Sequence, residues 1–440
     1  MASPEIEEEP LKGPPSKFTI TGLVIILVAI SQGFLGLSDL SMSYLYKDDF
    51  GMGPSEVAFA SSLASIPWII KPLWGFISDC FPIFGRRRSP YLAIFGIIGM
   101  CSWIYMSSSV NTPVAAVITM LIIQVCTAFC NVIGEALVVE ESQKGGDSPE
   151  DASKYVTLFF GTRAFGMLIT AYSGGILLEY IDKRTVFLIT ACFPLLLCVA
   201  ALLMKEHRVT ENPTINTQIK EIWQFVKMPQ VAWPITFIFL FMCTPSSGDA
   251  MFFYYTNDLG FEYEFMGRMK MAWGLATLIG MLVYNKWLKD VKFKPMFFWS
   301  CIIGCVMGLT QILLVTRSNV ALGIPDTVFA LSSNFLVQAL GELNAMPLLV
   351  LCCRICPKNI EGSLYALLMS TWNFGNLVSS QLGAVLMIGL GITETNFKLL
   401  WLMLLLTNLI MLIPLPLLKC IPEYERVEKE ERNSDGYNDV

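Results

Sequence analysis

The chain has 440 residues and a formal net charge of −6; 54% of its residues are hydrophobic and only 15% are charged. A soluble domain has about 25% charged residues, so this composition excludes a chain that covers itself with a polar surface in water. Apolar runs of about 20 residues, long enough to cross a bilayer as helices, recur along the whole chain. We therefore expect a multi-pass α-helical membrane protein without a separate soluble domain.

An acidic stretch precedes the first apolar run. Residues 1–17 include Glu5 and Glu7 to Glu9 and lack the basic leader of a signal peptide, so we expect this tail to stay attached to the first helix. Hydropathy predicts twelve spanning helices, at residues 18–46, 55–79, 90–108, 113–139, 154–181, 184–204, 231–256, 264–288, 295–316, 325–353, 361–391 and 396–418. Residues 419–440 form a second polar tail.

The longest internal polar stretch, residues 205–230, lies between the sixth and seventh helices. Ile219, Ile222, Trp223 and Val226 follow helical spacing within it, which predicts a short amphipathic helix on the membrane surface. This linker separates two halves of six helices each, at residues 18–204 and 231–418.

The positions of the basic residues predict the orientation, because Lys and Arg in short loops remain on the cytoplasmic side. If both termini are cytoplasmic, 21 of the 30 Lys and Arg lie inside and five lie outside. The other four, Lys71, Arg163, Arg268 and Lys270, fall within predicted helices. We expect cytoplasmic termini and a location in the plasma membrane, with an organelle membrane as the alternative.

Polar positions recur between the halves, as they do in transporters built from internal repeats. Asp39, Tyr44 and Asp48 of the first helix match Asp249, Tyr254 and Asp258 of the seventh. Shorter matches pair Gly134-Glu135 with Gly341-Glu342 and Phe165-Gly166 with Phe374-Gly375. Two parallel six-helix repeats are the architecture of the major facilitator superfamily, and we expect that fold.

The segment between the second and third helices combines Gly75 and Asp79 with Gly85 and the cluster Arg86, Arg87 and Arg88. This pattern is similar to the cytoplasmic signature of major facilitator transporters. Asp79 at a helix end can pair with the Arg cluster and form a latch that opens when the halves rock. Alternatively, the arginines only fix the topology.

The same segment inserts Phe81-Pro82-Ile83-Phe84 before Gly85, which lengthens the usual loop. The run from Lys71 to Tyr91 resembles the folate-biopterin transporter family, as do Gly134-Glu135 and the arginine in the fifth helix. The resemblance implies secondary transport of a folate, a pterin or a related anionic heteroaromatic compound. A carrier of another metabolite, such as S-adenosylmethionine, and a receptor that does not transport remain alternatives.

Charged side chains inside the membrane cost about 2.5–3.5 kcal/mol each on insertion scales, so each is a candidate for function. The candidates are Asp39, Lys71, Glu135, Arg163, Asp249 and Glu342; snorkelling to the interface explains Arg268 and Lys270. Small residues flank Arg163, whose guanidinium suits a carboxylate ligand, with Lys71 as a second positive charge. An ion pair between Arg163 and Glu135 is the structural alternative.

Asp39 and Asp249 lie where the two halves face each other, and both are predicted to bind substrate. A pterin ring presents a donor edge and a flat face, which fit a carboxylate and an aromatic side chain; Trp68, Phe165 and Trp372 are the stacking candidates. His207, the only histidine, lies in the linker, so proton coupling or gating falls to carboxylates, chiefly Glu135 and Glu342. Sodium coupling and exchange stay open.

The sequence contains no nucleophile with a histidine partner, no metal-ligand cluster and no phosphate-binding loop, which argues against an enzyme. We expect no metal and no cofactor. The expected partners are the small-molecule substrate and membrane lipid, without nucleic acid, and we expect a monomer.

Overall fold

The computed structural model describes residues 20–144, 149–204, 206, 227–288, 291–355 and 361–421. In these ranges the chain is helical, and the one pairing of extended backbone is an isolated bridge between Ile83 and Arg86. The predicted tail at 1–17, nearly all of the second tail and most of the linker with its amphipathic helix lie outside the described residues.

Helices of the first half account for the first six predicted spans. They are α1 (Ile20–Phe34), η1 (Leu35–Ser38), α2 (Asp39–Tyr44), η2 (Leu45–Asp49), α3 (Pro54–Ala64), α4 (Ile66–Ile69), α5 (Lys71–Cys80), α6 (Ser89–Ser108), α7 (Pro113–Lys144), α8 (Pro149–Tyr180), α9 (Lys183–Thr190) and α10 (Leu195–Leu203).

Helices of the second half account for the other six predicted spans. Its helices are α12 (Pro229–Met242), α13 (Gly248–Phe253), η3 (Tyr254–Asp258), α14 (Tyr263–Val283), η4 (Tyr284–Leu288), α15 (Phe293–Leu309), α16 (Gln311–Val315), α17 (Ser318–Ala321), α18 (Asp326–Ile355), α19 (Glu361–Leu390), α20 (Leu400–Ile410) and η5 (Leu415–Cys420). Each of the twelve predicted spans thus coincides with a helical segment.

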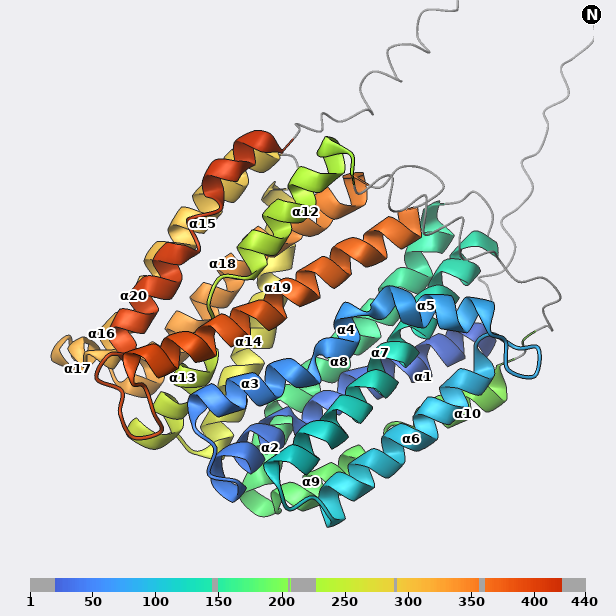
Figure 1. Cartoon of the computed structure of the whole chain (residues 1–440), viewed down its shortest axis with the longest axis horizontal. Coiled ribbons are helices and arrows are strands. Elements are labelled where there is room, and N and C mark those ends of the chain that lie inside the picture. Colours follow the sequence, from blue (N-terminus) through green and yellow to red (C-terminus); the bar gives the residue numbers. More distant parts are fainter. Residues whose placement is uncertain are drawn as a thin grey trace, which may run out of the picture.

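The two halves lie side by side, the first coloured blue to green and the second yellow-green to red in Figure 1. The described chain begins at Ile20 and ends at Ile421 on the same side of the bundle, called the terminal side below. The opposite side, called the far side, carries the ends of η2, α8 and η3 and the starts of α7, α9 and α14.

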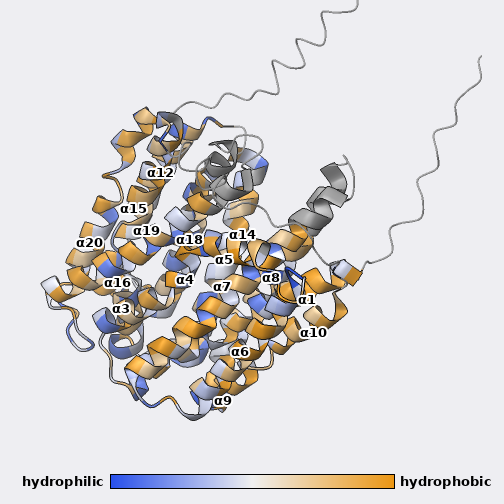
Figure 2. Cartoon of the chain, turned by 45° about the vertical axis from the view of Figure 1, so that its right-hand side comes forward, coloured by the Kyte–Doolittle hydropathy of each residue, from blue (hydrophilic) through white to orange (hydrophobic). Residues whose placement is uncertain are grey.

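Hydrophobic residues cover most of the helix surfaces, whereas hydrophilic residues gather near helix ends and at a few places inside the bundle (Figure 2). Six segments of the described chain are long and apolar enough to cross a membrane by length and composition: 20–49, 89–108, 113–138, 183–203, 293–315 and 400–420. The other predicted spans are interrupted helices or helices that carry charged or many polar residues. The chain is an all-α integral membrane protein with the expected repeat of six helices.

Helix 1 is broken where polar residues enter the membrane. Between α1 and α2 the four residues of η1 form a 3-10 turn, and Asp39 opens the next helix. In the second half α12 likewise ends at Met242, and Asp249 lies in the first turn of the following helix, α13. The first predicted span of each half then ends in a π-helical turn, which is η2 in the first half and η3 in the second. The sequence repeat is therefore also a repeat of backbone irregularities.

The halves touch most closely where α8 crosses α14. A Cβ atom added to Gly175 would lie 2.6 Å from the Gly267 Cα atom and 2.8 Å from the Tyr263 carbonyl oxygen. Glycines at such a crossing let two helix backbones approach closely, as is common in membranes. Nearby, the ring centroids of Tyr44 and Tyr263 are 4.5 Å apart across the same interface. These contacts hold the halves together on the far side.

Candidate functional site

A cavity of about 150 Å³ lies at the centre of the first half and includes several predicted site residues. Its lining contains Asp39, Trp68 and Arg163, together with residues that the sequence did not single out: Gln32, Leu35, Gly36, Trp103, Met120, Ile123, Gln124, Thr127 and Met167. The first five predicted spans therefore meet around one polar space, with α6 contributing Trp103.

Asp39 and Arg163 lie at different levels of this cavity. Gly33 of α1 packs against α8 so tightly that an added Cβ would lie 2.6 Å from the Arg163 carbonyl oxygen. Asp39 lies six residues further along helix 1, about 9 Å at 1.5 Å per residue. The Arg163 backbone therefore lies nearer the terminal side than Asp39, and Glu135 of α7 attracts its guanidinium; the cavity is bipolar, with a carboxylate at Asp39 and a cation at Arg163.

Arg163 has no hydrogen bond or ion pair with another residue of the described chain, although Glu135 lies near enough to attract it electrostatically. Both Glu135 carboxylate oxygens instead accept hydrogen bonds from the Lys71 ammonium, at 2.8 and 2.9 Å. The hydrogen-bonded partner of Glu135 is thus Lys71 of α5. The guanidinium keeps its donors free for a ligand.

Trp68 is held in place from both halves. Its indole Nε1 donates to Gln124 Oε1 at 3.0 Å, and its carbonyl oxygen accepts from the Asn373 side chain of α19 at 3.0 Å. The Lys71 ammonium lies 5.8 Å from the centroid of the indole ring. Trp68 therefore presents a fixed aromatic wall to the cavity.

Lys270 reaches the site from the second half, which the sequence interpretation did not anticipate. Its ammonium lies 3.8 Å from Asp39 Oδ2, so it is a central residue and not simply an interfacial one. A signal was present: Gly267 and Gly274 flank Lys270 at spacings of three and four, on the same helix face. Small neighbours of this kind also singled out Arg163. Arg268, by contrast, pairs with Glu264 on its own helix.

The remaining predicted residues lie elsewhere. Phe165 is 65% exposed and is not among the residues that line this cavity, and Trp372 packs against the hydrophobic core of the second half. Glu342 accepts a hydrogen bond from Gln338 at 2.9 Å. Asp249 is half-buried, and its carboxylate has no hydrogen-bond or ion-pair partner among the described residues.

The inserted loop after α5 forms a tight two-residue turn. Phe84 and Gly85 have φ values of 51° and 75°, and Ile83 and Arg86 exchange backbone hydrogen bonds of 3.0 Å. Positive φ at both central positions matches the twist of a type I′ turn and leaves the Phe84 side chain 87% exposed.

The arginines after this turn do not act alike. Arg86 is exposed, Arg87 is half-buried, and Arg88 is buried and donates to the Ser78 hydroxyl. The side chain of Asp79, the predicted latch partner, lies outside the described part of the structure.

Glu206 supplies a contact that the sequence analysis missed. Its carboxylate accepts hydrogen bonds from the backbone N–H groups of Arg87, Arg88 and Ser89, at 2.6 to 3.2 Å. A carboxylate at this place satisfies the free donors at the start of α6. The residue just after the last helix of the first half thereby anchors the loop that carries the arginine cluster.

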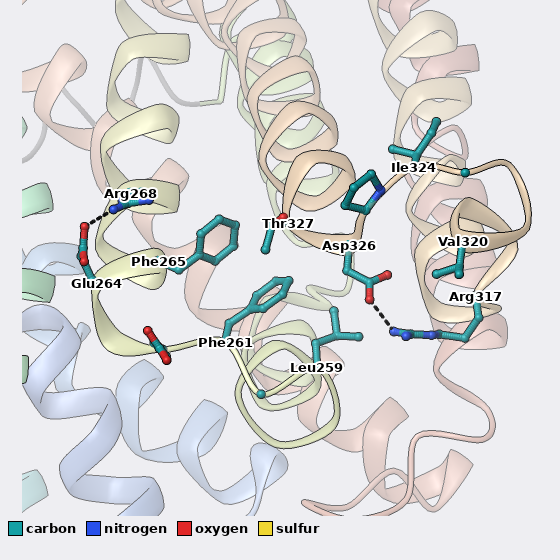
Figure 3. A pocket seen from close by; sticks show the side chains of 14 residues that line it. Leu259, Phe261, Glu264, Phe265, Arg268, Arg317, Val320, Ile324, Asp326 and Thr327 are labelled. Atoms are coloured by element: carbon teal, nitrogen blue, oxygen red, sulfur yellow. Dashed lines mark hydrogen bonds and ion pairs between the residues drawn. The ribbon is translucent and has the colours of Figure 1, made fainter.

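A larger cavity of about 840 Å³ opens at the far side of the second half, between α14 and the start of α18 (Figure 3). Both of its arginines are already paired, Arg268 with Glu264 and Arg317 with Asp326. The second half alone lines this cavity, as the first half alone lines the smaller one. We take the smaller cavity as the candidate site, because Arg163 in its lining has no hydrogen-bonded partner among the described residues and Asp39 in its lining lies 3.8 Å from Lys270 of the other half.

No group of three or more His, Cys, Asp or Glu residues suited to a metal ion occurs among the described residues. Chemically, the central cavity offers one carboxylate, one unpaired guanidinium, a second cation and an aromatic wall. Such a set is suited to a ligand that has a donor edge, a flat face and an anionic group.

Comparison with known proteins decides the family. The sequence profile of the BT1 family matches residues 32–438, nearly the whole chain. The chain belongs to the BT1 family. Among curated relatives, this BT1 member is 39% identical over 421 residues to a folate-biopterin transporter of Synechocystis sp., with 94% of this chain and 85% of that protein covered. It is 32% identical over 426 residues to folate transporter 2 of Plasmodium falciparum, with coverage of 97% and 92%.

Solved structures confirm the fold expected for this BT1 member. The nucleoside transporter NupG superposes with a TM-score of 0.70 at 14% identity, covering 92% of this chain and all of that one. A D-xylose-proton symporter gives a TM-score of 0.68 at 16% identity, with coverage of 93% and 99%. At these identities the likeness establishes the architecture and nothing about the ligand.

Proposed function

We propose that this chain is a secondary active transporter that moves a folate, a pterin or a related anionic heteroaromatic metabolite by alternating access. The named functions of its relatives support the substrate class. The two pseudo-equivalent halves support the mechanism, because such folds rock around a site between their repeats.

The observation that carries the proposal is the bipolar cavity with its free guanidinium. A folate has a pterin ring with a donor edge at one end and carboxylates at the other. Asp39 accepts hydrogen bonds from the ring edge, Trp68 offers a flat face, and Arg163 binds a carboxylate through two parallel N–H groups. The order of these groups along the cavity matches the order of groups along the ligand.

The size of the cavity supports a moving site. Its volume of about 150 Å³ is well below the roughly 300–1,000 Å³ of pockets that enclose ligands of drug size. The halves are in close contact at Gly175 and Gly267 on the far side. Admitting a folate therefore requires the halves to separate, which is the motion that alternating access supplies.

In the same proposal the terminal side faces the cytoplasm, as the excess of basic residues in its loops indicates. The arginine cluster with Asp79 then forms the cytoplasmic latch, and Glu206 holds the loop that carries the cluster in place. Lys71 and Glu135 lie between this latch and the ligand, as a gate that a second anionic group can disrupt.

A ligand panel tests the substrate class. With purified protein in detergent, folic acid and biopterin are expected to raise the midpoint of thermal unfolding, because a ligand that binds only the folded state stabilises it. S-adenosylmethionine and D-xylose at equal concentrations are expected to have no effect. Labelled folic acid should then enter proteoliposomes. If only S-adenosylmethionine stabilises the protein, the proposed substrate class is wrong. If none of the four compounds does, the proposed binding site is refuted.

Proton coupling is the second part of the proposal, and we assign the coupling proton to Asp249. Its carboxylate lies in the membrane without a described partner, whereas those of Glu135 and Glu342 accept hydrogen bonds. A carboxylate without a counter-ion in a poorly solvated place readily exchanges a proton.

Asp249→Asn is therefore expected to abolish the stimulation of folic acid uptake by an imposed proton gradient, while exchange of folic acid across the membrane without a gradient persists. Asp258→Asn, nine residues later at the exposed end of the same helix, is the matched control and should behave as the wild type. Uptake by the wild type that ignores the proton gradient contradicts proton coupling, and a gradient response retained by Asp249→Asn contradicts the assignment.

A further inference from the structure

One ion pair crosses between the halves inside the candidate site. Among ion pairs in which both side chains are described, only that between Lys270 of α14 and Asp39 of α2 joins the two halves. The others join residues of the same half. This pair therefore depends on how the halves are arranged.

The close crossing of α8 and α14 positions Lys270. Gly267, which packs on Gly175, lies three residues before Lys270, so both project from the same face of α14. Lys270 thus follows the tightest contact between the halves by about one helical turn. From there its side chain extends to the far-side end of the cavity, where Asp39 lies.

The geometry of the pair is that of an exchangeable contact. The separation of 3.8 Å exceeds the 2.7–2.9 Å of a hydrogen-bonded N–H and carboxylate pair. The two side chains are 38% and 62% exposed, so neither charge is fully withdrawn from water. Lys71 and Glu135, by contrast, approach to 2.8 Å. A loose and solvated pair contributes little stability and yields to a better donor.

The carboxylate that Lys270 approaches is the one assigned above to the donor edge of the ligand. We propose that Lys270 is an internal competitor for the ligand: it occupies Asp39 in the empty transporter, and a bound ring edge displaces it. This inference rests on the proposed function. It links occupancy of the site to the release of a contact between the halves, because the ligand and Lys270 cannot both pair fully with one carboxylate.

The direction in which Lys270→Gln changes the affinity for biopterin tests the inference. Biopterin is the probe, since it has the pterin edge and no carboxylate and so separates Asp39 from Arg163. Lys270→Gln removes the competitor and is expected to tighten biopterin binding about threefold, a size typical of a solvated ion pair. Asp39→Asn is expected to weaken binding about tenfold or more. In the double variant, the Lys270→Gln change is expected to have no further effect, because no pair remains to break.

Two further variants sharpen the result. Lys270→Arg keeps the charge and presents a planar fork of N–H donors that fits both carboxylate oxygens, so it is expected to weaken biopterin binding, opposite in sign to Lys270→Gln. Arg268 lies two residues away, pairs with Glu264 on its own helix, interacts with Tyr172 of α8 and does not line the cavity. Arg268→Gln is therefore the matched control, and its affinity is expected to be unchanged.

Weaker biopterin binding in Lys270→Gln would make Lys270 a ligand contact, and unchanged binding would show that the pair does not compete; both results overturn the inference. Neither touches the proposed function, provided that the wild type binds folic acid and biopterin. If the wild type binds neither probe, the proposed function itself fails.

Discussion

Arg163→Ala is expected to abolish folic acid uptake at concentrations that saturate the wild type. A guanidinium that grips a carboxylate through two charged hydrogen bonds contributes about 3 kcal/mol, or roughly a hundredfold in affinity. Biopterin has no carboxylate, and its affinity should be nearly unchanged. Equilibrium binding of the two compounds to the same preparation gives the comparison.

The variant should remain folded, because Arg163 has no hydrogen-bonded partner among the described residues and Glu135 keeps Lys71. Arg163→Lys, which preserves a point charge without the fork, should recover part of the folic acid affinity. Arg268→Ala, an exposed arginine paired within its own helix, is the control. An equal loss of biopterin and folic acid binding in Arg163→Ala would remove the guanidinium from the proposed carboxylate subsite.

Gly175→Ala is expected to push α8 and α14 apart and weaken closure of the far side. The new methyl group would lie 2.6 to 2.9 Å from backbone atoms of α14, which cannot rotate away. Overpacking of this kind costs about 1–3 kcal/mol, enough to shift a balance between two conformations about fivefold to more than a hundredfold. Hydrogen–deuterium exchange should therefore become faster in η2 and in the first turns of α14, and folic acid uptake should fall.

Gly161→Ala is the matched control on the same helix, since a Cβ atom there would have nothing within 4 Å. It should leave exchange and uptake unchanged. If Gly175→Ala also leaves both unchanged, the glycine crossing is not a contact on which the transport cycle depends.

Much of the architecture was predictable because the bilayer imposes a simple rule on sequence. Each apolar run long enough to span became a helical segment, and the repeat of Asp39 and Tyr44 in Asp249 and Tyr254 marked the same helix break in each half. The cost of charge in lipid also singled out Asp39 and Arg163, which line one cavity.

The partners of these charges were less predictable, because they depend on packing between distant helices. In the sequence, Lys270 falls six residues after the predicted start of its helix, where snorkelling is a sufficient explanation, and only the approach of α14 to α8 brings it to Asp39. Glu206 lies in a polar stretch without any pattern, and its role appears only when the chain ends of two helices meet.

Aromatic candidates were the weakest predictions, because an aromatic residue in a membrane helix is equally suited to packing, to lipid and to a ligand. Trp68 lines the cavity, whereas Phe165 is largely exposed and Trp372 packs against a core. Nothing in sequence spacing separates these three situations.

The halves repeat each other in backbone but not in charge, and this difference gives the proposed carrier a direction. Asp39 faces a lysine across the interface, while Asp249 has no described cation opposite it. In the proposed site, a folate has its ring edge at Asp39 and its carboxylates at Arg163, so it lies with its ring toward the far side and its carboxylates toward the terminal side. An imported folate would then enter the protein with its carboxylate end first and leave it with the same end first, without turning around inside the protein.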